Sequence, residues 1–144
     1  MAEILLIEDN PADILLTKEA FKECLHEHNI TAFKDGSEAM KYLRRKGEYS
    51  GSRIPDLVLL DLNLPKKDGR ELLAEIKSDK DICTIPVIIL STSKNDRDIQ
   101  ASYELKANCY ICKPVELDSF ISIILSIEKF WLKTVRLPVY EKII

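Results

Sequence analysis

Residues 57–69, LVLLDLNLPKKDG, decide the class of fold. Four apolar residues are followed by a carboxylate, Asp61, and then by a mostly polar segment that reaches Gly69. An apolar run without polar alternation is typical of a strand that is covered on both faces, as in a parallel sheet. Similar runs occur at ILLI (4–7) and VIILS (87–91). We therefore expect an α/β fold, with helices on both faces of a parallel sheet.

Helical patterns separate these strands. Asn10 and Pro11 suit the N-cap and the first helical position, and Ser37 is expected to cap a second helix. The first helix should place one set of residues on its core face: Ile14, Thr17, Phe21, Cys24 and Leu25. The other elements are expected as strands at 31–34 and 109–112, and as helices at 37–45, 69–78, 95–106 and 115–133. Such a (βα)₅ chain favours a doubly wound sheet in the flavodoxin-like order 2-1-3-4-5.

Composition indicates one domain in a chain of 144 residues, with the domain at 1–133 and a C-terminal extension at 134–144. With 24 acidic and 21 basic residues, the net charge of −3 offers no basic surface for nucleic acid or an anionic membrane. No apolar run approaches the roughly 18 residues of a membrane span, so we expect a cytoplasmic protein. The four cysteines, at 24, 83, 109 and 112, are expected to be reduced.

Three carboxylates are expected to meet at the carboxyl ends of neighbouring strands. Glu8 and Asp9 follow the strand at 4–7, and Asp61 follows the strand at 57–60. Two such charges about 4 Å apart repel by roughly 4 kcal/mol at an effective dielectric of 20, so the cluster requires a cation or a raised pKa. Oxygen ligands favour Mg²⁺, with Mn²⁺ as the substitute. The alternative is an ordinary acidic surface at strand ends.

Ser91 ends the strand at 87–91 and Lys113 directly follows the strand at 109–112, so both are expected at the same carboxyl edge of the sheet. The Lys113 ammonium can reach towards Asp61 and pair with anionic oxygens, whereas a lone Lys-Pro would otherwise be a surface lysine before a helix. The Ser91 hydroxyl faces the same crevice.

These segments together resemble the response-regulator receiver domains of two-component signalling systems. The resemblance covers residues 1 to about 130 and rests on LLIEDNPAD (5–13), LLDLNLPKKDG (59–69), Ser91-Thr92 and Lys113-Pro114. It implies that Asp61 accepts a phosphoryl group from a histidine kinase, and that Lys113 pairs with the acyl phosphate. It also implies an Mg²⁺ site formed by Glu8, Asp9, Asp61 and the backbone carbonyl of Asn63.

The resemblance further implies a switch. Ser91 would be its hydroxyl, Tyr110 would be its rotating aromatic, and the Lys113-Pro114 bond would be cis. Phosphorylation would then repack the face formed by residues 95–133, and the protein would catalyse only its own phosphorylation and dephosphorylation. The runs NLPKKDGRELLAEIK (63–77) and EKFWLKTVRLP (128–138) are most similar to small receivers that partner cyanobacterial phytochrome kinases.

Two other functions are compatible with a doubly wound sheet. A phosphatase of the aspartyl type would need a second Asp two residues after Asp61, where Asn63 stands. A binding module without phosphorylation, either a flavin carrier or a degenerate receiver, is the second alternative. The complete acidic cluster argues against degeneracy, and Asn10-Pro11 stands where a flavin carrier would have a Gly-rich phosphate loop.

Partner surfaces are expected on two sides. The resemblance places kinase docking on the first helix and around Pro114 and Val115, and Leu15 projects roughly 100° away from Ile14 and off the core stripe. Between 117 and 132 apolar positions sweep roughly 220°, more than one sheet covers. Phe130 and Trp131 are therefore candidate anchors of a homodimer. The alternative is a C-terminal tail that folds back over the last helix. His26 and His28 are expected to be solvated, and Cys109 and Cys112 are expected to pack in the core.

Overall fold

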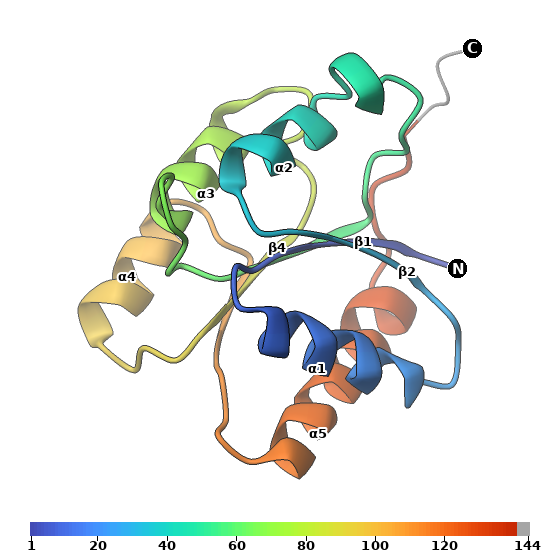
Figure 1. Ribbon diagram of the computed structural model, residues 1–144, viewed down its shortest axis with the longest axis vertical. Coiled ribbons are helices and arrows are strands. Elements are labelled where there is room, and N and C mark those ends of the chain that lie inside the picture. The colour runs from blue at the N-terminus through green and yellow to red at the C-terminus, as the bar shows by residue number, and fades with distance from the viewer. Residues whose placement is uncertain (141–144) are drawn as a thin grey trace.

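The computed structural model describes residues 1–140, and it has the expected α/β architecture (Figure 1). Five parallel strands form one sheet in the order β2-β1-β3-β4-β5, which confirms the predicted order. The strands are β1 (Glu3–Ile7), β2 (Asn29–Phe33), β3 (Leu57–Leu60), β4 (Val87–Ser91) and β5 (Cys109–Cys112). The last part of the predicted extension, residues 141–144, lies outside the described range.

Helices cover both faces of the sheet. They are α1 (Pro11–Lys22), α2 (Gly36–Leu43), α3 (Gly69–Ser78), α4 (Asp96–Glu104) and α5 (Leu117–Ile127), with a short 3₁₀ turn, η1 (Gly47–Tyr49). The helix predicted at 115–133 is divided, because α5 passes at Glu128 into a π-helical segment, η2 (Glu128–Thr134). In Figure 1, α1 and α5 lie together below the sheet, and α2 and α3 lie above it.

The core follows from the alternation of side chains along each strand. In β1, Leu5 and Ile7 join the cluster under α2 and α3, whereas Ile4 and Leu6 join the cluster under α1 and α5. β3 is wholly buried because both of its faces are covered. The apolar runs of the sequence are therefore strands between two helical layers, as expected.

Two helix ends differ from the predictions. Asn10 caps α1 as expected, accepting from the backbone N–H of Ala12 at 2.9 Å. α2, however, begins one residue earlier, because the Asp35 carboxylate accepts from the N–H of Ser37 at 2.8 Å. The carboxylate is the better acceptor for a free N–H at the positive end of a helix. Leu25 is also misplaced: α1 ends at Lys22, and Leu25 beyond it is 85% exposed.

The prediction for His28 was wrong, because its side chain is buried rather than solvated. Its Nε2 lies 2.8 Å from a carboxylate oxygen of Glu128, and its Nδ1 accepts from the N–H of Ala2 at 3.2 Å. This contact joins the loop after α1 to the start of η2, a hundred residues later. The chain brings them together because α1 and α5 pack against each other.

The C-terminal tail continues from η2 along its own domain. The Tyr140 hydroxyl lies 2.9 Å from the Thr84 hydroxyl, and the Tyr140 ring packs against the core cluster under α2 and α3. η2, in contrast, contributes Trp131 and Leu132 to the cluster under α1 and α5. The described tail therefore passes from the layer of α1 and α5 to the layer of α2 and α3, rather than folding back over α5 as the alternative expected.

Within residues 1–140, no helix has the length and apolarity that a membrane crossing requires. The four cysteines are all free thiols and partly buried, so the two at 109 and 112 form no disulfide. Burial and the nearby Glu128 carboxylate raise the pKa of the Cys24 thiol to about 11, which keeps it protonated.

The Glu128 carboxyl predicts a specific pH dependence of stability. Burial raises its pKa, but the hydrogen bond with His28 and the charge of Lys133 outweigh burial and hold the pKa below its usual value. Its contribution to stability is therefore complete above the unfolded pKa and is lost as the pH falls through the lower folded value. We expect Glu128→Gln to lower the free energy of unfolding by about 1–2 kcal/mol at about pH 7.

The difference in the free energy of unfolding between the wild type and Glu128→Gln should shrink below a pH of about 4.5, the ordinary pKa of the carboxyl. Urea unfolding across a pH series measures it. The matched control is Glu19→Gln, which removes a carboxylate from the exposed pair with Lys22 and should change stability by less than about 0.5 kcal/mol. A Glu128→Gln difference that stays constant from about pH 7 to about pH 3 would contradict the assigned ionisation.

Candidate functional site

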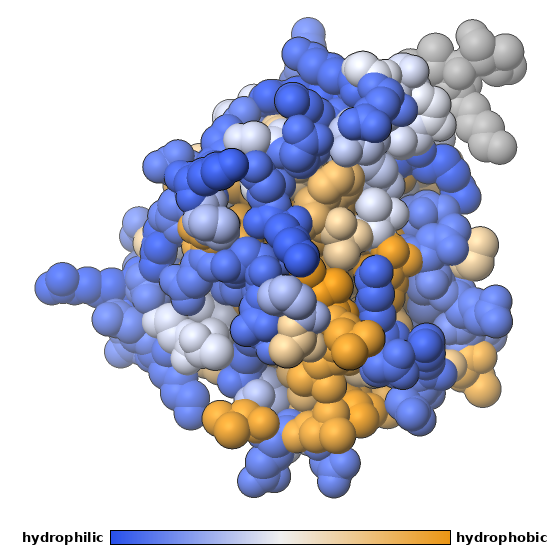
Figure 2. Space-filling model, viewed as in Figure 1, coloured by the Kyte–Doolittle hydropathy of each residue, from blue (hydrophilic) through white to orange (hydrophobic). Residues whose placement is uncertain are grey.

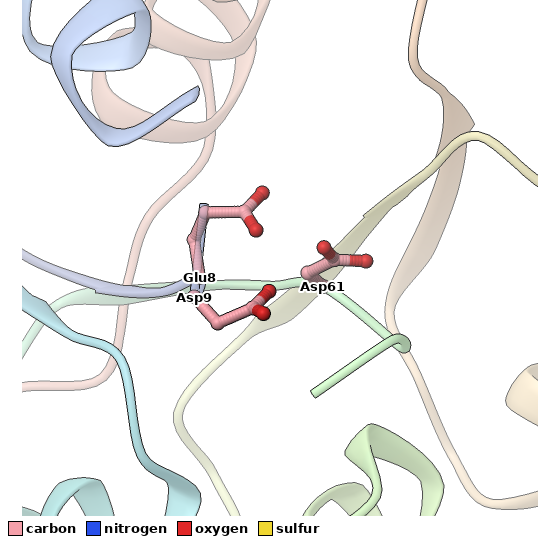
Figure 3. Close-up of side chains that lie close together, drawn as sticks. All are labelled: Glu8, Asp9 and Asp61. Atoms are coloured by element: carbon pink, nitrogen blue, oxygen red, sulfur yellow. The ribbon is translucent and has the colours of Figure 1, made fainter. Parts of the chain in front are cut away.

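Three carboxylates converge at the carboxyl edge of the sheet. Glu8 and Asp9 follow β1, and Asp61 follows the neighbouring strand β3. One oxygen from each carboxylate lies within 4.8 Å of the other two, and Figure 3 shows the three groups turned towards one another. Glu8 is 3% exposed and Asp61 is 8% exposed. The sequence predicted this cluster correctly.

The backbone around Asp61 fixes the direction of its side chain. Its N–H donates to the carbonyl of Ile7 at 3.0 Å, which continues the ladder between β1 and β3 by one residue. One Asp61 side-chain oxygen accepts from the N–H of Asn63 at 3.1 Å. Beyond Asn63 the chain returns to start α3, and the N–H of Gly69 donates to the carbonyl of Leu62 at 3.0 Å.

Gly69 lies so close to this strand end that no side chain fits. A Cβ atom placed on Gly69 would stand 2.5 Å from the Asp61 carbonyl oxygen and 2.5 Å from the Leu62 Cα. Backbone atoms cannot move aside as a flexible side chain can. The glycine therefore allows α3 to begin directly beside Asp61, a role that its place in the sequence motif alone does not explain.

Lys113 supplies the positive charge of the site. It directly follows β5, and its N–H donates to the Ser91 carbonyl at 2.7 Å. Its ammonium donates to the Glu8 carboxylate, and it lies 3.2 Å from an Asp13 oxygen and 3.5 Å from an Asp61 oxygen. Asp13 was not predicted, although its place in the first turn of α1, just after Asn10-Pro11, could have indicated it.

Burial and mutual contacts shift the pKa values of the charged groups in the site. Burial raises the pKa of the Glu8 carboxyl to about 7; the hydrogen bond with Lys113 opposes this rise, and the nearby Asp61 adds to it. Burial also lowers the pKa of the Lys113 ammonium, but its hydrogen bond with Glu8 and the charge of Asp61 outweigh burial and raise it. The Lys113 ammonium contacts three carboxyl groups, those of Glu8, Asp13 and Asp61, and Asp9 adds a fourth to the cluster.

A divalent cation fits this arrangement. The donor set contains carboxylate oxygens alone, and hard divalent ions take such ligands. Glu8 and Asp61 are also buried enough that water alone screens their repulsion poorly. Glu8, Asp9 and Asp61 are the residues that would hold the ion.

The predicted switch residues lie beside this cluster. The Ser91 side chain is fully buried, and its hydroxyl oxygen accepts from the N–H of Ser93 at 3.2 Å. The Tyr110 hydroxyl donates to the Ser93 carbonyl at 2.9 Å. Since Tyr110 pairs with Ile89 and Ser91 is two residues farther along β4, both side chains project to the same face of the sheet. The Lys113-Pro114 bond is not cis, contrary to the expectation, since residues 1–140 contain no cis peptide bond.

The predicted partner residues are mostly exposed. Leu15 in α1 and Val115 before α5 are exposed, and so is Phe130 in η2, which follows the far end of α5. Trp131 is partly buried and packs edge-to-face on Phe130, with 5.4 Å between ring centroids.

Comparison with known proteins gives one consistent result. Residues 4–125 match the family model described as the response regulator receiver domain. The chain is 50% identical over 135 residues to response regulator Rcp1 of Synechocystis, covering 94% of this chain and 92% of the relative. It is 38% identical to FilR2 of Methanothrix harundinacea, a probable methanogenesis regulatory protein, over 94% of this chain and 86% of that one.

Two crystal structures of cyanobacterial proteins are closely similar. The phosphorylated phytochrome response regulator RcpA superposes with a TM-score of 0.92 at 54% identity, covering 96% of this chain and 99% of that chain. The Mn²⁺-bound form of Rcp1 superposes with a TM-score of 0.90 at 49% identity, covering 96% and 100%.

The close approach at Gly69 predicts that even a methyl group there is costly. We expect Gly69→Ala to lower the free energy of unfolding by about 1–3 kcal/mol, because the new Cβ meets backbone atoms of the β3 end. Urea unfolding measures the loss. Gly51→Ala is the matched control, since a Cβ there has no neighbour within 4 Å, and it should leave stability nearly unchanged. Equal stabilities of the two variants would rule out the close approach.

Proposed function

The chain belongs to the response regulator receiver domain family of signalling proteins, and we propose that it accepts a phosphoryl group from a histidine kinase on Asp61. The observation that supports this most is the convergence of Glu8, Asp9 and Lys113 on the buried Asp61 carboxylate. The proposed metal is Mg²⁺, with Mn²⁺ as a substitute, and the backbone carbonyl of Asn63 is proposed as a further ligand. Membership of this family leaves no reason to prefer a flavin carrier or an aspartyl phosphatase.

The proposed reaction is an in-line displacement at phosphorus. An Asp61 oxygen forms a bond to the phosphorus atom while the bond to the kinase's histidine nitrogen breaks, and that nitrogen leaves with the electron pair. A bound Mg²⁺ would neutralise charge on the phosphoryl oxygens. Lys113 already lies 3.5 Å from Asp61 and would pair with one of these oxygens, and Glu8 and Asp9 would hold the ion.

Phosphorylation is proposed to act on the Ser91 hydroxyl. The acyl phosphate adds negative charge and hydrogen-bond acceptors beside the end of β4. Ser91 would then donate to a phosphate oxygen, and the face formed by α4, β5 and α5 would repack. Tyr110 already packs against the core cluster under α2 and α3 with its hydroxyl on the Ser93 carbonyl, so it needs no inward turn from this arrangement.

Asp61→Asn should abolish acid-labile phosphorylation, because the amide is a poor nucleophile and removes an anion from the metal site. Incubation with acetyl phosphate and Mg²⁺, followed by intact mass measurement, tests this. Chelation of the metal should also prevent labelling of the wild type. Asp56→Asn is the matched control and should label normally, because Asp56 directly precedes the start of β3, at the other end of the strand from Asp61. Normal labelling of Asp61→Asn would exclude Asp61 as the acceptor.

The partner is proposed to be a phytochrome-type histidine kinase, because similar proteins include cyanobacterial phytochrome response regulators. We also propose a cytoplasmic location, because the kinase would make its phosphohistidine from the ATP of the cytoplasm. The net charge of −3 gives no reason to add nucleic acid or a membrane to these partners.

The kinase is proposed to dock on the first half of α1 and the loop before α5. Leu15 is 61% exposed, and Val115 and Leu117 are exposed as well. Pro114 joins Val115 to Lys113 and so lies beside the reacting group. Figure 2 shows apolar surface gathered in the lower part of the molecule, where α1 and α5 lie. Exposed apolar side chains in this number next to the site favour a protein partner.

Leu15→Asp should slow phosphoryl transfer from the cognate kinase at least about tenfold, because a charge replaces an apolar contact at the interface. Labelling by acetyl phosphate should be unchanged, since Leu15 does not touch the carboxylate cluster. Leu25→Asp is the matched control, being 85% exposed but beyond the far end of α1, and transfer to it should be normal. Normal transfer to Leu15→Asp would remove Leu15 from the docking surface.

A homodimer through α4, β5, α5 and the extension is also proposed. Phe130 is 52% exposed and Leu125 is 38% exposed, which leaves an apolar strip on α5 and η2. The hollow on this strip, beside Phe130 and Trp131, has a volume of about 200 Å³. A hollow of about 450 Å³ lies away from the strip, beside residues 138–140 of the tail. α1 covers part of the apolar arc of α5, so the uncovered part is narrower than the roughly 220° of the sequence pattern.

Trp131→Glu should weaken the dimer, and phosphorylation of the wild type should strengthen it by linkage. Sedimentation velocity with and without acetyl phosphate measures both effects. Leu25→Glu is the control, since Leu25 is 85% exposed beyond the end of α1 and outside the proposed interface, and this variant should sediment as the wild type does. A wild type that stays monomeric at high concentration in both states would refute the dimer.

A further inference from the structure

Asp13 contacts Lys113 but has no part in the proposed reaction. Its carboxylate lies 3.2 Å from the Lys113 ammonium, which also contacts Glu8 and Asp61. The Asp13 side chain is 36% exposed, whereas those of Glu8 and Asp61 are 3% and 10% exposed. Of these three carboxylates, Asp13 is therefore the one that meets the solvent and the molecules that arrive from it.

The first turn of α1 holds Asp13 in this place. The N–H of Asp13 donates to the side-chain oxygen of Asn10 at 3.3 Å, and its carbonyl accepts from the Thr17 hydroxyl at 2.7 Å. Thr17 is itself buried. The position of Asp13 therefore depends on the start of a helix and not on the arrangement of the loop between β4 and α4.

The Asp13 charge is close enough to act on a ligand at Asp61. The Lys113 ammonium lies 3.2 Å from an Asp13 oxygen and 3.5 Å from an Asp61 oxygen. These two oxygens are therefore no more than about 7 Å apart, which is within the screening length of about 8 Å at physiological ionic strength. An anion held at Asp61 is thus repelled by Asp13, and a cation is attracted.

We propose that Asp13 is a specificity-determining residue that lowers the reactivity of Asp61 towards small, strongly anionic phosphodonors. It repels the phosphoryl oxygens of the donor, and it also pairs with the ammonium of Lys113 that would otherwise serve those oxygens alone. Both effects have the same sign. The inference rests on the proposed phosphorylation of Asp61, and it adds a residue that the sequence motifs did not indicate.

A docked kinase is affected less than a small donor. The proposed kinase interface includes the first half of α1 and the loop before α5, so its contacts can offset repulsion at the phosphoryl group. A small donor has few contacts besides the phosphoryl group, and the repulsion acts on most of its binding energy. Asp13 thereby favours phosphorylation by the kinase over phosphorylation by small molecules.

The rates of labelling by two donors of different charge test this role. Asp13→Asn removes the charge but keeps a side-chain oxygen that can accept from Lys113. At saturating Mg²⁺ and neutral pH, acetyl phosphate, a dianion, should label this variant about two- to five-fold faster than the wild type. Phosphoramidate carries one negative charge fewer and should gain less. Intact mass measurement over time gives both rates.

Binding without reaction separates the effect of charge from an effect on structure. At saturating Mg²⁺, Asp13→Asn should bind beryllofluoride, an anionic mimic of the phosphoryl group, about two- to five-fold more tightly than the wild type. It should bind Mg²⁺ alone about two- to five-fold more weakly, because the cation loses an attractive charge. Titration calorimetry measures both affinities. A role in stability only would not move them in opposite directions.

Glu19→Gln is the matched control. Glu19 lies in the same helix, is 53% exposed and pairs with Lys22, so its replacement changes the net charge equally without touching the site. Its labelling rates and both affinities should stay at the wild-type values. Asp13→Glu keeps the charge and should retain the wild-type ratio of the two labelling rates.

The outcomes distinguish this role from the proposed function. Labelling of Asp13→Asn by acetyl phosphate that is unchanged or slower, or an equal gain with both donors, would overturn the role of Asp13 and leave the proposed function intact. The same holds if the affinities for beryllofluoride and Mg²⁺ change in the same direction. A wild type that neither donor labels in the presence of Mg²⁺ would overturn both.

Discussion

The repulsion among buried carboxylates at one edge of the sheet is the constraint on which this structure depends. Glu8, Asp9 and Asp61 stand within 4.8 Å of one another because parallel strands present their carboxyl ends on the same side. Lys113 offsets part of this repulsion through its contacts with Glu8 and Asp61. A divalent cation bound here would offset the remaining excess of negative charge, and such a cation would in turn help to hold the proposed phosphoryl group.

The rest of the fold keeps these charges in place. β1 and β3 are buried between two helical layers, so the strand ends that bear the carboxylates cannot shift independently. Gly69 brings α3 directly against the Asp61 backbone. At the opposite edge, the His28–Glu128 contact and the Tyr140–Thr84 contact fix the C-terminal segment to the domain. In the loop between β4 and α4, in contrast, polar contacts of Ser93 hold the chain.

Ser93 and the carboxylate cluster are held in different ways. Ser93 has hydrogen bonds of ordinary length with Ser91, Asp98, Asn95 and Tyr110, and such bonds can be exchanged for others at small cost. The carboxylate cluster, in contrast, is bound by charge and burial.

The amino-acid sequence by itself determined the sheet, its strand order and the carboxylate cluster. Unbroken apolar runs specify buried parallel strands, and each charged residue next to such a run must lie at a strand end, because burial fixes the register. Contacts between residues far apart in the chain were decided only by the tertiary structure. Nothing local to His28 indicates that Glu128 would bury it, and Asp35 displaced Ser37 as a cap through geometry that composition does not specify. The contacts of Asp98 with Arg70 and with Ser93 belong to the same class, since polar side chains on separate elements pair only after packing has placed the elements side by side.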